Sequence, residues 1–324
     1  MNVIDQRVRA GVIGVGSLGR EHARVYASLE RVGSLAVYDR IASRAGEVAS
    51  LHGAATCDTI EELLDSCDAV SICTPTTHHC RTAEMAFERG VHVLVEKPIA
   101  ASSAEGERMI ELAAGKGCTF QVGHIERFNG AFQAALPFLD GPLFIESHRL
   151  GTFTPRGLDV SVVLDLMIHD IDLVLRVLKN DRVKELRASG TPVLTGSPDI
   201  VNARIEFESG CVANITASRI SREPMRKIRF FQENLYVSID LRGKIVEAFE
   251  KTGGDPDGFA ADPVSCIRPL AVTVDTREPL LKEIVSFLDA VETGARPKVS
   301  GEDGLEALVV AERVLEAIGG VARR

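Results

Sequence analysis

The stretch "VVLDLMIHDID", residues 162 to 172, places acid–base side chains inside an apolar pattern. At 100° per residue in a helix, Asp165, His169 and Asp172 fall within about 60° of one another. A neutral histidine can take a proton at neutral pH, and an aspartate one turn earlier can orient its ring or a substrate hydroxyl. Because burying these groups in a core costs free energy, we expect them to face a cleft. Asp170 projects about 140° away and is expected at the surface.

A second reactive group, Lys97, ends the apolar run "GVHVLVEKP" at residues 90 to 98. Such a run predicts a buried parallel strand, and open α/β sheets bind ligands at the carboxyl ends of their strands. Pro98 restricts the backbone of the lysine and so fixes its direction. The alternative interpretation is a surface lysine beside a turn proline.

A glycine-rich turn, "GVIGVGSLGREHA" at residues 11 to 23, predicts a dinucleotide site. Gly14 permits a tight turn, Gly16 lets a pyrophosphate approach, and Gly19 lets the helix pack on the strand. The helix start, with Ser17 and Leu18, offers N–H groups to phosphates.

Asp39 ends the next strand-like run, twenty residues after Gly19. Its carboxylate can accept a hydrogen bond from a ribose 2′-hydroxyl and would repel a 2′-phosphate, so NAD is favoured over NADP. Arg40 and Arg44 follow and could offset that repulsion, or they are solvated charges at a helix start. NADP therefore stays an alternative.

The elements that must hold these groups change character along the chain. Up to about residue 122, short apolar runs rich in β-branched residues alternate with helical patterns, which predicts a doubly wound parallel α/β sheet of the Rossmann type. From 123 to 300, a helix is followed by runs of alternating polar and apolar residues, which predict an α+β domain with a large, mostly antiparallel sheet. We expect the final helix, 301–324, to pack back on the N-terminal domain.

The predicted strands of this second domain are "VKELRASG", "IVNARIEFESG", "CVANITASRI", "MRKIRFFQENLYVSIDL" and "KIVEAFEK".

Composition limits the partners and the compartment. The net charge of −9, three Tyr and no Trp argue against binding to nucleic acid or an anionic membrane. Seven Cys without a CxxC pair suit reduced thiols in a cytosol. The sequence shows neither a signal peptide nor a run of roughly 18 apolar residues, so we expect a cytoplasmic protein.

"TPTTHH" at 74 to 79, the "EKP" of 96 to 98, the glycine turn and the Asp165/His169 pair together resemble the Gfo/Idh/MocA family of sugar and polyol dehydrogenases. The resemblance covers essentially the whole chain and implies that it is an oxidoreductase. It implies that Thr74, Pro75 and His79 line the nicotinamide side of the cofactor.

By the same resemblance, Glu96 and Lys97 approach the nicotinamide and the substrate, His169 is the acid/base, and Asp165 assists it. Lys97 would hydrogen-bond the reacting oxygen and stabilise its developing negative charge. Asp172 matches a further acidic position of the family, or it makes structural hydrogen bonds.

The segment "VGHIERFNGAF" at 122 to 132 resembles the family branch that oxidises C3 of UDP-N-acetylglucosamine to the 3-keto sugar nucleotide. His124, Arg127 and Arg156 are the further substrate-binding candidates, and the two arginines could hold a diphosphate. Either arginine could instead form an interdomain ion pair. The alternatives are a dehydrogenase of a free sugar or inositol, and a catalytically silent NAD-binding regulator.

We predict no metal, because hydride transfer to a nicotinamide needs none, although Asp165, His169 and Asp172 could conceivably hold one. The open face of the antiparallel sheet is expected to pair with another subunit, giving a homodimer or homotetramer.

Overall fold

The computed structural model describes residues 7–153, 160–179, 181–252 and 266–321. The chain divides into two compact units. The N-terminal unit consists of Met1–Ile125 and Glu278–Leu308, and the C-terminal unit consists of Glu126–Arg277 and Val309–Arg324.

The sheet of the N-terminal unit has six parallel strands in the order β3-β2-β1-β4-β5-β6. They are β1 (Val8–Ile13), β2 (Val32–Tyr38), β3 (Ala55–Thr56), β4 (Ala69–Ile72), β5 (His92–Glu96) and β6 (Phe120–Gly123). The order reverses between β1 and β4, which is the switch point where such sheets bind ligands. This arrangement confirms the predicted doubly wound sheet.

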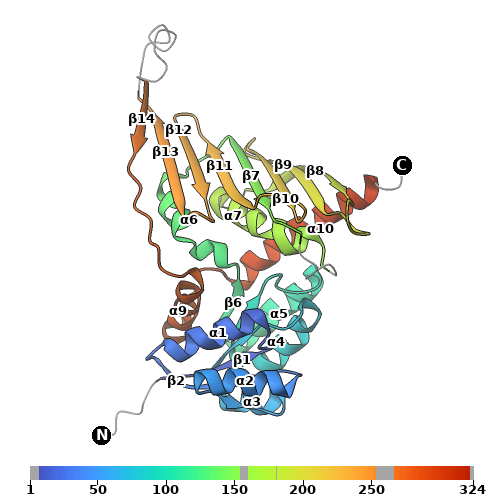
Figure 1. Cartoon of the computed structure of the whole chain (residues 1–324), viewed down its shortest axis with the longest axis vertical. Coiled ribbons are helices and arrows are strands. Elements are labelled where there is room, and N and C mark those ends of the chain that lie inside the picture. The colour runs from blue at the N-terminus through green and yellow to red at the C-terminus, as the bar shows by residue number, and fades with distance from the viewer. Residues whose placement is uncertain (1–6, 154–159, 180, 253–265, 322–324) are drawn as a thin grey trace. The chain divides into compact units, whose positions relative to one another are not determined.

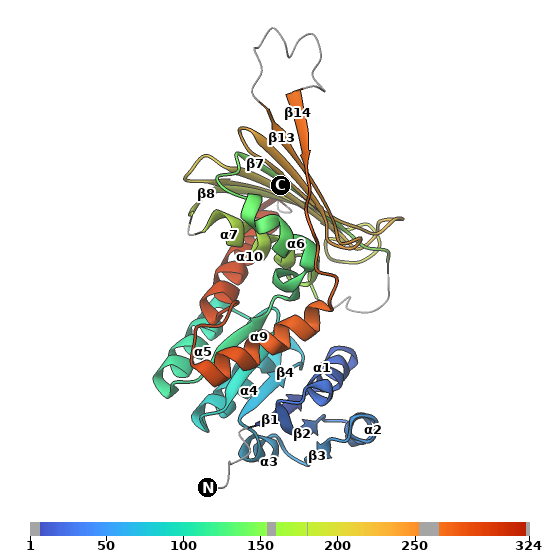
Figure 2. The ribbon, with the colours of Figure 1, turned by 90° about the vertical axis from the view of Figure 1, so that its left-hand side faces the viewer.

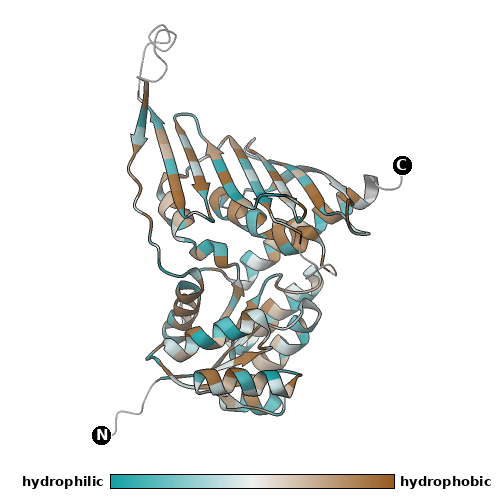
Figure 3. Cartoon of the chain, viewed as in Figure 1, coloured by the Kyte–Doolittle hydropathy of each residue, from teal (hydrophilic) through white to brown (hydrophobic). Residues whose placement is uncertain are grey.

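The central strands are buried because they are apolar on both faces. All four residues of β4 are buried, as are all residues of β5 except His92, and the strands of this sheet are largely brown in Figure 3. The helices around the sheet are α1 (Ser17–Ser28), α2 (Ala42–His52), α3 (Ile60–Ser66), the 3₁₀ turn η1 (Thr76–His78), α4 (His79–Glu88), α5 (Ser103–Lys116) and α9 (Pro279–Thr293) (Figure 1).

Local signals set the ends of these helices. The Thr59 and Ser102 side chains accept the N–H groups of Glu62 and Glu105 and so begin α3 and α5. Left-handed glycines end α2, α5 and α9 at Gly53, Gly117 and Gly294. The C-terminal segment contributes to the N-terminal core through α9, whose Ile284 and Phe287 belong to the same apolar cluster as Val12 and Val37.

The C-terminal unit is built on an eight-stranded sheet in the order β14-β13-β12-β11-β7-β10-β9-β8. Its strands are β7 (Phe144–Leu150), β8 (Val183–Thr191), β9 (Ile200–Phe207), β10 (Val212–Ser218), β11 (Met225–Phe231), β12 (Leu235–Asp240), β13 (Ile245–Lys251) and β14 (Ile267–Leu270). Every pair is antiparallel except β7 with β10. The prediction of a large, mostly antiparallel sheet is confirmed.

Two strands are not among those predicted. β7 is central and β14 is at the edge. In β7, Ser147 and Arg149 are buried together with Ile145, so the polar and apolar residues share one face. The run "MRKIRFFQENLYVSIDL" is two strands, β11 and β12, joined by a turn in which Gln232 N–H donates to the Leu235 carbonyl over 2.9 Å.

Helices cover one face of this sheet and leave the other open (Figures 1 and 2). They are η2 (Ile125–Phe128), α6 (Gly130–Ala135), η3 (Leu136–Phe138), the π-helical turn η4 (Val163–Met167), α7 (Ile168–Leu178) and α10 (Gly301–Val321). No helix in the described parts of the chain is long and apolar enough to cross a bilayer.

α10 contributes to both units. A Cβ at Gly301 or Gly304 would lie 2.7 Å from Phe120 or 2.6 Å from Val122, so this end of the helix packs closely on β6. Near its other end, Ile318 lies 3.2 Å from where a Cβ of Gly190 on β8 would be.

Candidate active site

The glycine turn between β1 and α1 has the geometry that a dinucleotide requires. Gly14 has φ +86°, which favours glycine, and a Cβ at Gly19 would lie 1.9 Å from the Gly14 carbonyl oxygen. At Gly16, by contrast, no described atom apart from the glycine itself and its neighbours along the chain lies within 4 Å of where a Cβ would be. Gly14 is therefore favoured by its backbone conformation and Gly19 is required by packing, while Gly16 leaves open space in which a phosphate could approach the backbone.

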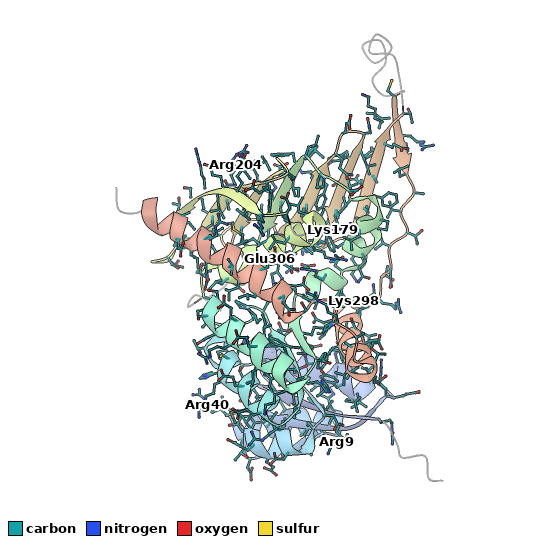
Figure 4. The ribbon with its side chains drawn as sticks, turned by 180° about the vertical axis from the view of Figure 1, so that it is seen from behind. Arg9, Arg40, Lys179, Arg204, Lys298 and Glu306 are labelled. Carbon is teal, nitrogen blue, oxygen red and sulfur yellow. The ribbon has the colours of Figure 1, made fainter. Side chains whose placement is uncertain are left out.

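Asp39, at the end of β2, supports this turn. Its carboxylate accepts the Val15 N–H at 3.0 Å and the Ile41 N–H at 2.9 Å, and the Arg44 guanidinium lies 3.5 Å away. The Asp39 side chain is only 8% exposed. Arg40 is exposed and projects from the surface of the N-terminal unit (Figure 4).

The residues around the turn fit a nicotinamide dinucleotide. Ser17 and Leu18 are exposed at the start of α1, whose first turn contains no acidic residue to repel a phosphate. Thr74 follows β4, on the other side of the switch point, and its buried Oγ1 has no hydrogen-bond partner among the described residues. Pro75 beside it is exposed.

The turn after β5 carries Lys97, and a buried series of side-chain hydrogen bonds supports it. Glu96 Oε1 lies 3.0 Å from His22 Nε2, and Glu96 Oε2 accepts the backbone N–H of Lys97 over 3.3 Å. His22 Nδ1 lies 3.0 Å from Ser71 Oγ, which in turn lies 2.9 Å from the Tyr26 hydroxyl. His22, Tyr26 and Ser71 are fully buried.

His79 lies between two backbone carbonyls. Its Nδ1 is 2.9 Å from the Pro98 oxygen and its Nε2 is 2.9 Å from the Thr74 oxygen. Burial lowers the pKa of the ring, which favours the neutral form. The ring is 1% exposed, so its contacts are with the backbone of the two turns that carry Thr74 and Lys97.

His22, Cys73 and Glu96 are a group of described residues whose potential metal-ligating atoms all lie within 4.8 Å of one another. Both ring nitrogens of His22 already make hydrogen bonds. Burial, followed by the nearby Glu96 carboxylate, raises the pKa of the Cys73 thiol well above its usual value, so the thiol stays protonated. We therefore interpret this group as a hydrogen-bonded core.

Asp165 and His169 lie where the helix of the opening motif departs from α geometry. Asp165 is in the π turn η4, in which the Ile168 N–H reaches the Val163 carbonyl, and His169 is in the first turn of α7. Both side chains are partly exposed. π turns of this kind often occur at functional sites.

The neighbouring aspartates have a different role. Asp172 is fully buried, and its carboxylate accepts two hydrogen bonds from Arg127 at 2.8 and 2.7 Å. The surface position expected for Asp170 is wrong, because Asp170 is 1% exposed and accepts two hydrogen bonds from Arg149 at 2.8 and 3.2 Å. Arg149 also donates to Glu126 over 3.0 Å.

These contacts explain why an apolar helix carries so many charges. Two of its aspartates neutralise buried arginines, and Asp165 and His169 remain partly exposed. The Arg127–Asp172 pair lies within the C-terminal unit, so the ion pair considered for Arg127 is not an interdomain one.

The structure groups most cofactor candidates in the N-terminal unit, at the carboxyl ends of β1, β4 and β5. His124 is in the same unit and fully buried. Arg156 lies outside the described residues. Four of the polar residues described above were not predicted from the sequence: His22, Tyr26, Ser71 and Arg149. The first three are polar residues inside the apolar patterns of α1 and β4, and that mismatch was the available signal.

Comparisons with known proteins identify the family. The Gfo/Idh/MocA model of an oxidoreductase family with an NAD-binding Rossmann fold matches residues 8–124, and the model of the Gfo/Idh/MocA C-terminal domain matches residues 121–237. Over 318 residues, the chain is 36% identical to UDP-N-acetylglucosamine 3-dehydrogenase of Acidithiobacillus ferrooxidans, covering 98% of this chain and 99% of that protein. The chain belongs to the Gfo/Idh/MocA oxidoreductase family.

This Gfo/Idh/MocA oxidoreductase also resembles solved structures. The A. ferrooxidans enzyme matches it with a TM-score of 0.88 at 35% identity, over 96% of this chain and 98% of that one. Inositol 2-dehydrogenase of Rhizobium meliloti is 26% identical over 96% of this chain and 97% of that protein. The predicted family and enzyme class are therefore confirmed.

Proposed function

We propose that this oxidoreductase uses NAD to oxidise the C3 hydroxyl of UDP-N-acetylglucosamine to the 3-keto sugar nucleotide. The observation that carries the proposal is the full-length similarity to a dehydrogenase of that substrate, at 36% identity. The residue types support it, because the lysine and histidine that such a reaction needs are both present.

In this proposal His169 takes the proton of the reacting hydroxyl, since a neutral imidazole is a suitable base near neutral pH. Asp165, one turn earlier, orients the ring or a neighbouring sugar hydroxyl. Lys97 donates a hydrogen bond to the same oxygen and stabilises the charge that develops on it. The cofactor, when bound, accepts the hydride from carbon.

The residues proposed to hold the cofactor are those of the glycine turn and the two turns beside it. They are Gly14, Gly16, Ser17, Leu18, Gly19, Asp39, Arg40, Thr74, Pro75, His79, Glu96 and Lys97. NAD is preferred to NADP, because a 2′-phosphate would meet the Asp39 carboxylate. His79 would act through the backbone of the turns that it contacts.

The substrate residues proposed in addition are His124, Arg127 and Arg156. Arg127 donates from Nε and one terminal nitrogen to Asp172, which supports the ion-pair alternative for this residue. Arg156 is the second candidate for the diphosphate.

The second candidate function is oxidation of a free inositol-type polyol. It is supported by full-length similarity to two inositol dehydrogenases, at 26% identity each. The two functions share their chemistry and differ in whether the site holds a diphosphate.

The test measures NADH formation by the purified protein with NAD and UDP-N-acetylglucosamine. Free N-acetylglucosamine, inositol and glucose are tested in parallel. Hydrazine is added to trap the ketone product and so shift the equilibrium toward oxidation. We expect turnover with the nucleotide sugar alone. Turnover with inositol alone would replace the first proposal by the second, and silence throughout with NAD still bound would favour a regulator.

We also propose that the chain forms a homodimer or homotetramer through the open face of its large sheet. A row of aromatic rings crosses this face from β7 to β13, with centroids 5.7, 5.1 and 6.3 Å apart. Its members are Phe144, Phe231, Tyr236 and Phe249. Charged residues flank the row, including the Arg229–Glu146 pair at 2.9 Å and exposed Arg204 (Figure 4). An apolar strip with a polar rim suits a subunit interface.

A further inference from the structure

Lys97 lies between two anchored neighbours. Before it, the Glu96 carboxylate is bound to His22 inside the core, and after it, the Pro98 carbonyl faces the buried ring of His79. We propose that His22, acting through Glu96, is a positioning residue that holds Lys97 in its reactive orientation. This inference rests on the catalytic role proposed for Lys97.

The side-chain hydrogen bonds that connect Glu96 to His22, Ser71 and Tyr26 can be assigned a consistent order of donors and acceptors. An ionised carboxylate only accepts hydrogen bonds, so the contact with Glu96 requires the proton on His22 Nε2. A neutral ring then accepts at Nδ1 from the Ser71 hydroxyl, and Ser71 accepts from the Tyr26 hydroxyl. Burial raises the pKa of Tyr26, which keeps that donor protonated. Each hydrogen bond in this series from Tyr26 to Glu96 thus has one donor and one acceptor when His22 is neutral.

The carboxylate has little freedom in this position. A Cβ added at Gly123, which pairs with Glu96 across β5 and β6, would lie 3.0 Å from Cδ and from both carboxylate oxygens. The second oxygen of Glu96 accepts the N–H of Lys97 itself. The position of the carboxylate therefore fixes the backbone at which the lysine side chain begins.

The His79 ring lies between the turn after β4, which carries Thr74, and the turn after β5, which carries Pro98. Carbonyl oxygens only accept, so a neutral ring donates to one of the two, Pro98 or Thr74, and only packs against the other. Rigid support of this kind matters because small errors in placement are costly to a reaction, with about 1 Å worth about 100-fold in rate.

The first experiment uses NMR to monitor the environment of the Lys97 side chain in the absence of substrate. Lysines are reductively methylated with ¹³C-formaldehyde, and the Lys97 signal is identified as the one lost in Lys97→Arg. We expect the Lys97 signal to shift or broaden in His22→Leu and in Gly123→Ala, while the signal of exposed Lys184 stays unchanged. His52→Leu, in the same unit, is the matched control and should leave Lys97 unchanged. An unmoved Lys97 signal in both variants would overturn the proposal.

The second experiment measures kinetics with the substrate found for the wild type. In His22→Leu, kcat should fall about 10- to 100-fold, with the NAD dissociation constant unchanged and an increased primary deuterium isotope effect from substrate deuterated at the reacting carbon. His22→Gln, which can still donate to Glu96, should recover part of kcat.

If the substitution only reduced the amount of folded protein, the apparent kcat would fall because less enzyme is active, and the isotope effect would not change. A lower kcat with an unchanged isotope effect would therefore overturn the positioning role. If Lys97 moves in the NMR experiment but the wild type oxidises none of the tested alcohols, the proposed function fails and the support of Lys97 stands.

Discussion

The individual polar residues of this enzyme fall into two groups, according to whether they bind the backbone or face the solvent. Some, such as His79 and Asp39, are buried and hold backbone groups. Others, such as Asp165 and His169, are partly exposed and are proposed to meet the substrate. Substitutions in the two groups should therefore be separable by measuring binding and turnover independently.

Replacing a proposed catalytic group should stop the reaction without unfolding the protein. Lys97→Ala and His169→Ala should each lower kcat by about 100- to 10,000-fold, as is typical when a proton-transfer group is removed. Calorimetric titration should still detect NAD binding, and circular dichroism should be unchanged. Full activity in either variant would remove that residue from the mechanism.

Asp39→Ala should weaken NAD binding by about 10- to 100-fold, the value of a lost charged hydrogen bond, and should narrow the preference for NAD over NADP. The measurement is kcat/KM with each cofactor. Glu61→Ala, at an exposed acidic residue of α3 in the same unit, is the control. An unchanged ratio in Asp39→Ala would limit that residue to its backbone contacts with Val15 and Ile41.

At the scale of elements, the helix η4–α7 is joined to the sheet by buried ion pairs. Asp170 on α7 binds Arg149 on β7, and Arg149 also binds Glu126 on η2. Because the Asp170 and Arg149 side chains are 2% and 4% exposed, solvent cannot replace a lost partner.

Asp170→Ala should therefore destabilise the protein by about 3–5 kcal/mol, since it leaves a buried arginine with one carboxylate fewer. Urea unfolding followed by circular dichroism measures the change. Adding Arg149→Met should cost less than the two single changes summed, because the pair is then removed together. Strict additivity would contradict the pairing.

The turn between β8 and β9 should make stability depend on pH. Burial alone would raise the pKa of Asp199, but the N–H groups of Val193, Leu194 and Thr195 and the Thr195 hydroxyl outweigh burial and lower it. A lowered pKa in the folded state means that the stabilisation is present above the unfolded pKa of about 3.9 and is lost as pH falls through the folded value.

Asp199→Asn should consequently lower the melting temperature at pH 7, and the difference from the wild type should shrink below about pH 4. Thermal unfolding between pH 7 and pH 3 tests this. Asp140→Asn, in an exposed aspartate, provides the control. A difference that is constant across this range would show that the charge of Asp199 is not involved.

For the whole molecule, the open sheet face is the feature that predicts assembly. Tyr236→Asp places a charge in the aromatic row and should shift the protein from an oligomer to a monomer, as measured by size-exclusion chromatography with light scattering. Leu51→Asp is the control, because Leu51 is an apolar residue 62% exposed in the other unit. A wild-type protein that is monomeric at all concentrations would refute the interface.

Local patterns in the sequence were sufficient to predict the class of each unit. The glycine turn, the uniformly apolar strands and the alternating runs each follow from contacts close in sequence or from burial on one or two faces. They predicted the parallel sheet and the mostly antiparallel sheet, whereas the family was predicted from the resemblance of the short motifs. They failed at β7, where the polar Ser147 and Arg149 share the buried face with Ile145, so the polar–apolar alternation of a half-buried strand is missing.

The tertiary structure alone decided which polar residues pair. Asp170 was expected at the surface because helical angles describe one helix and carry no information about Arg149, which lies 21 positions away on β7. The His22–Glu96 contact joins residues 74 positions apart, and the Arg127–Asp172 pair joins residues 45 apart. Such partners meet only when strands and helices distant in sequence pack together, because a buried charge or donor must find its counterpart wherever the fold brings one.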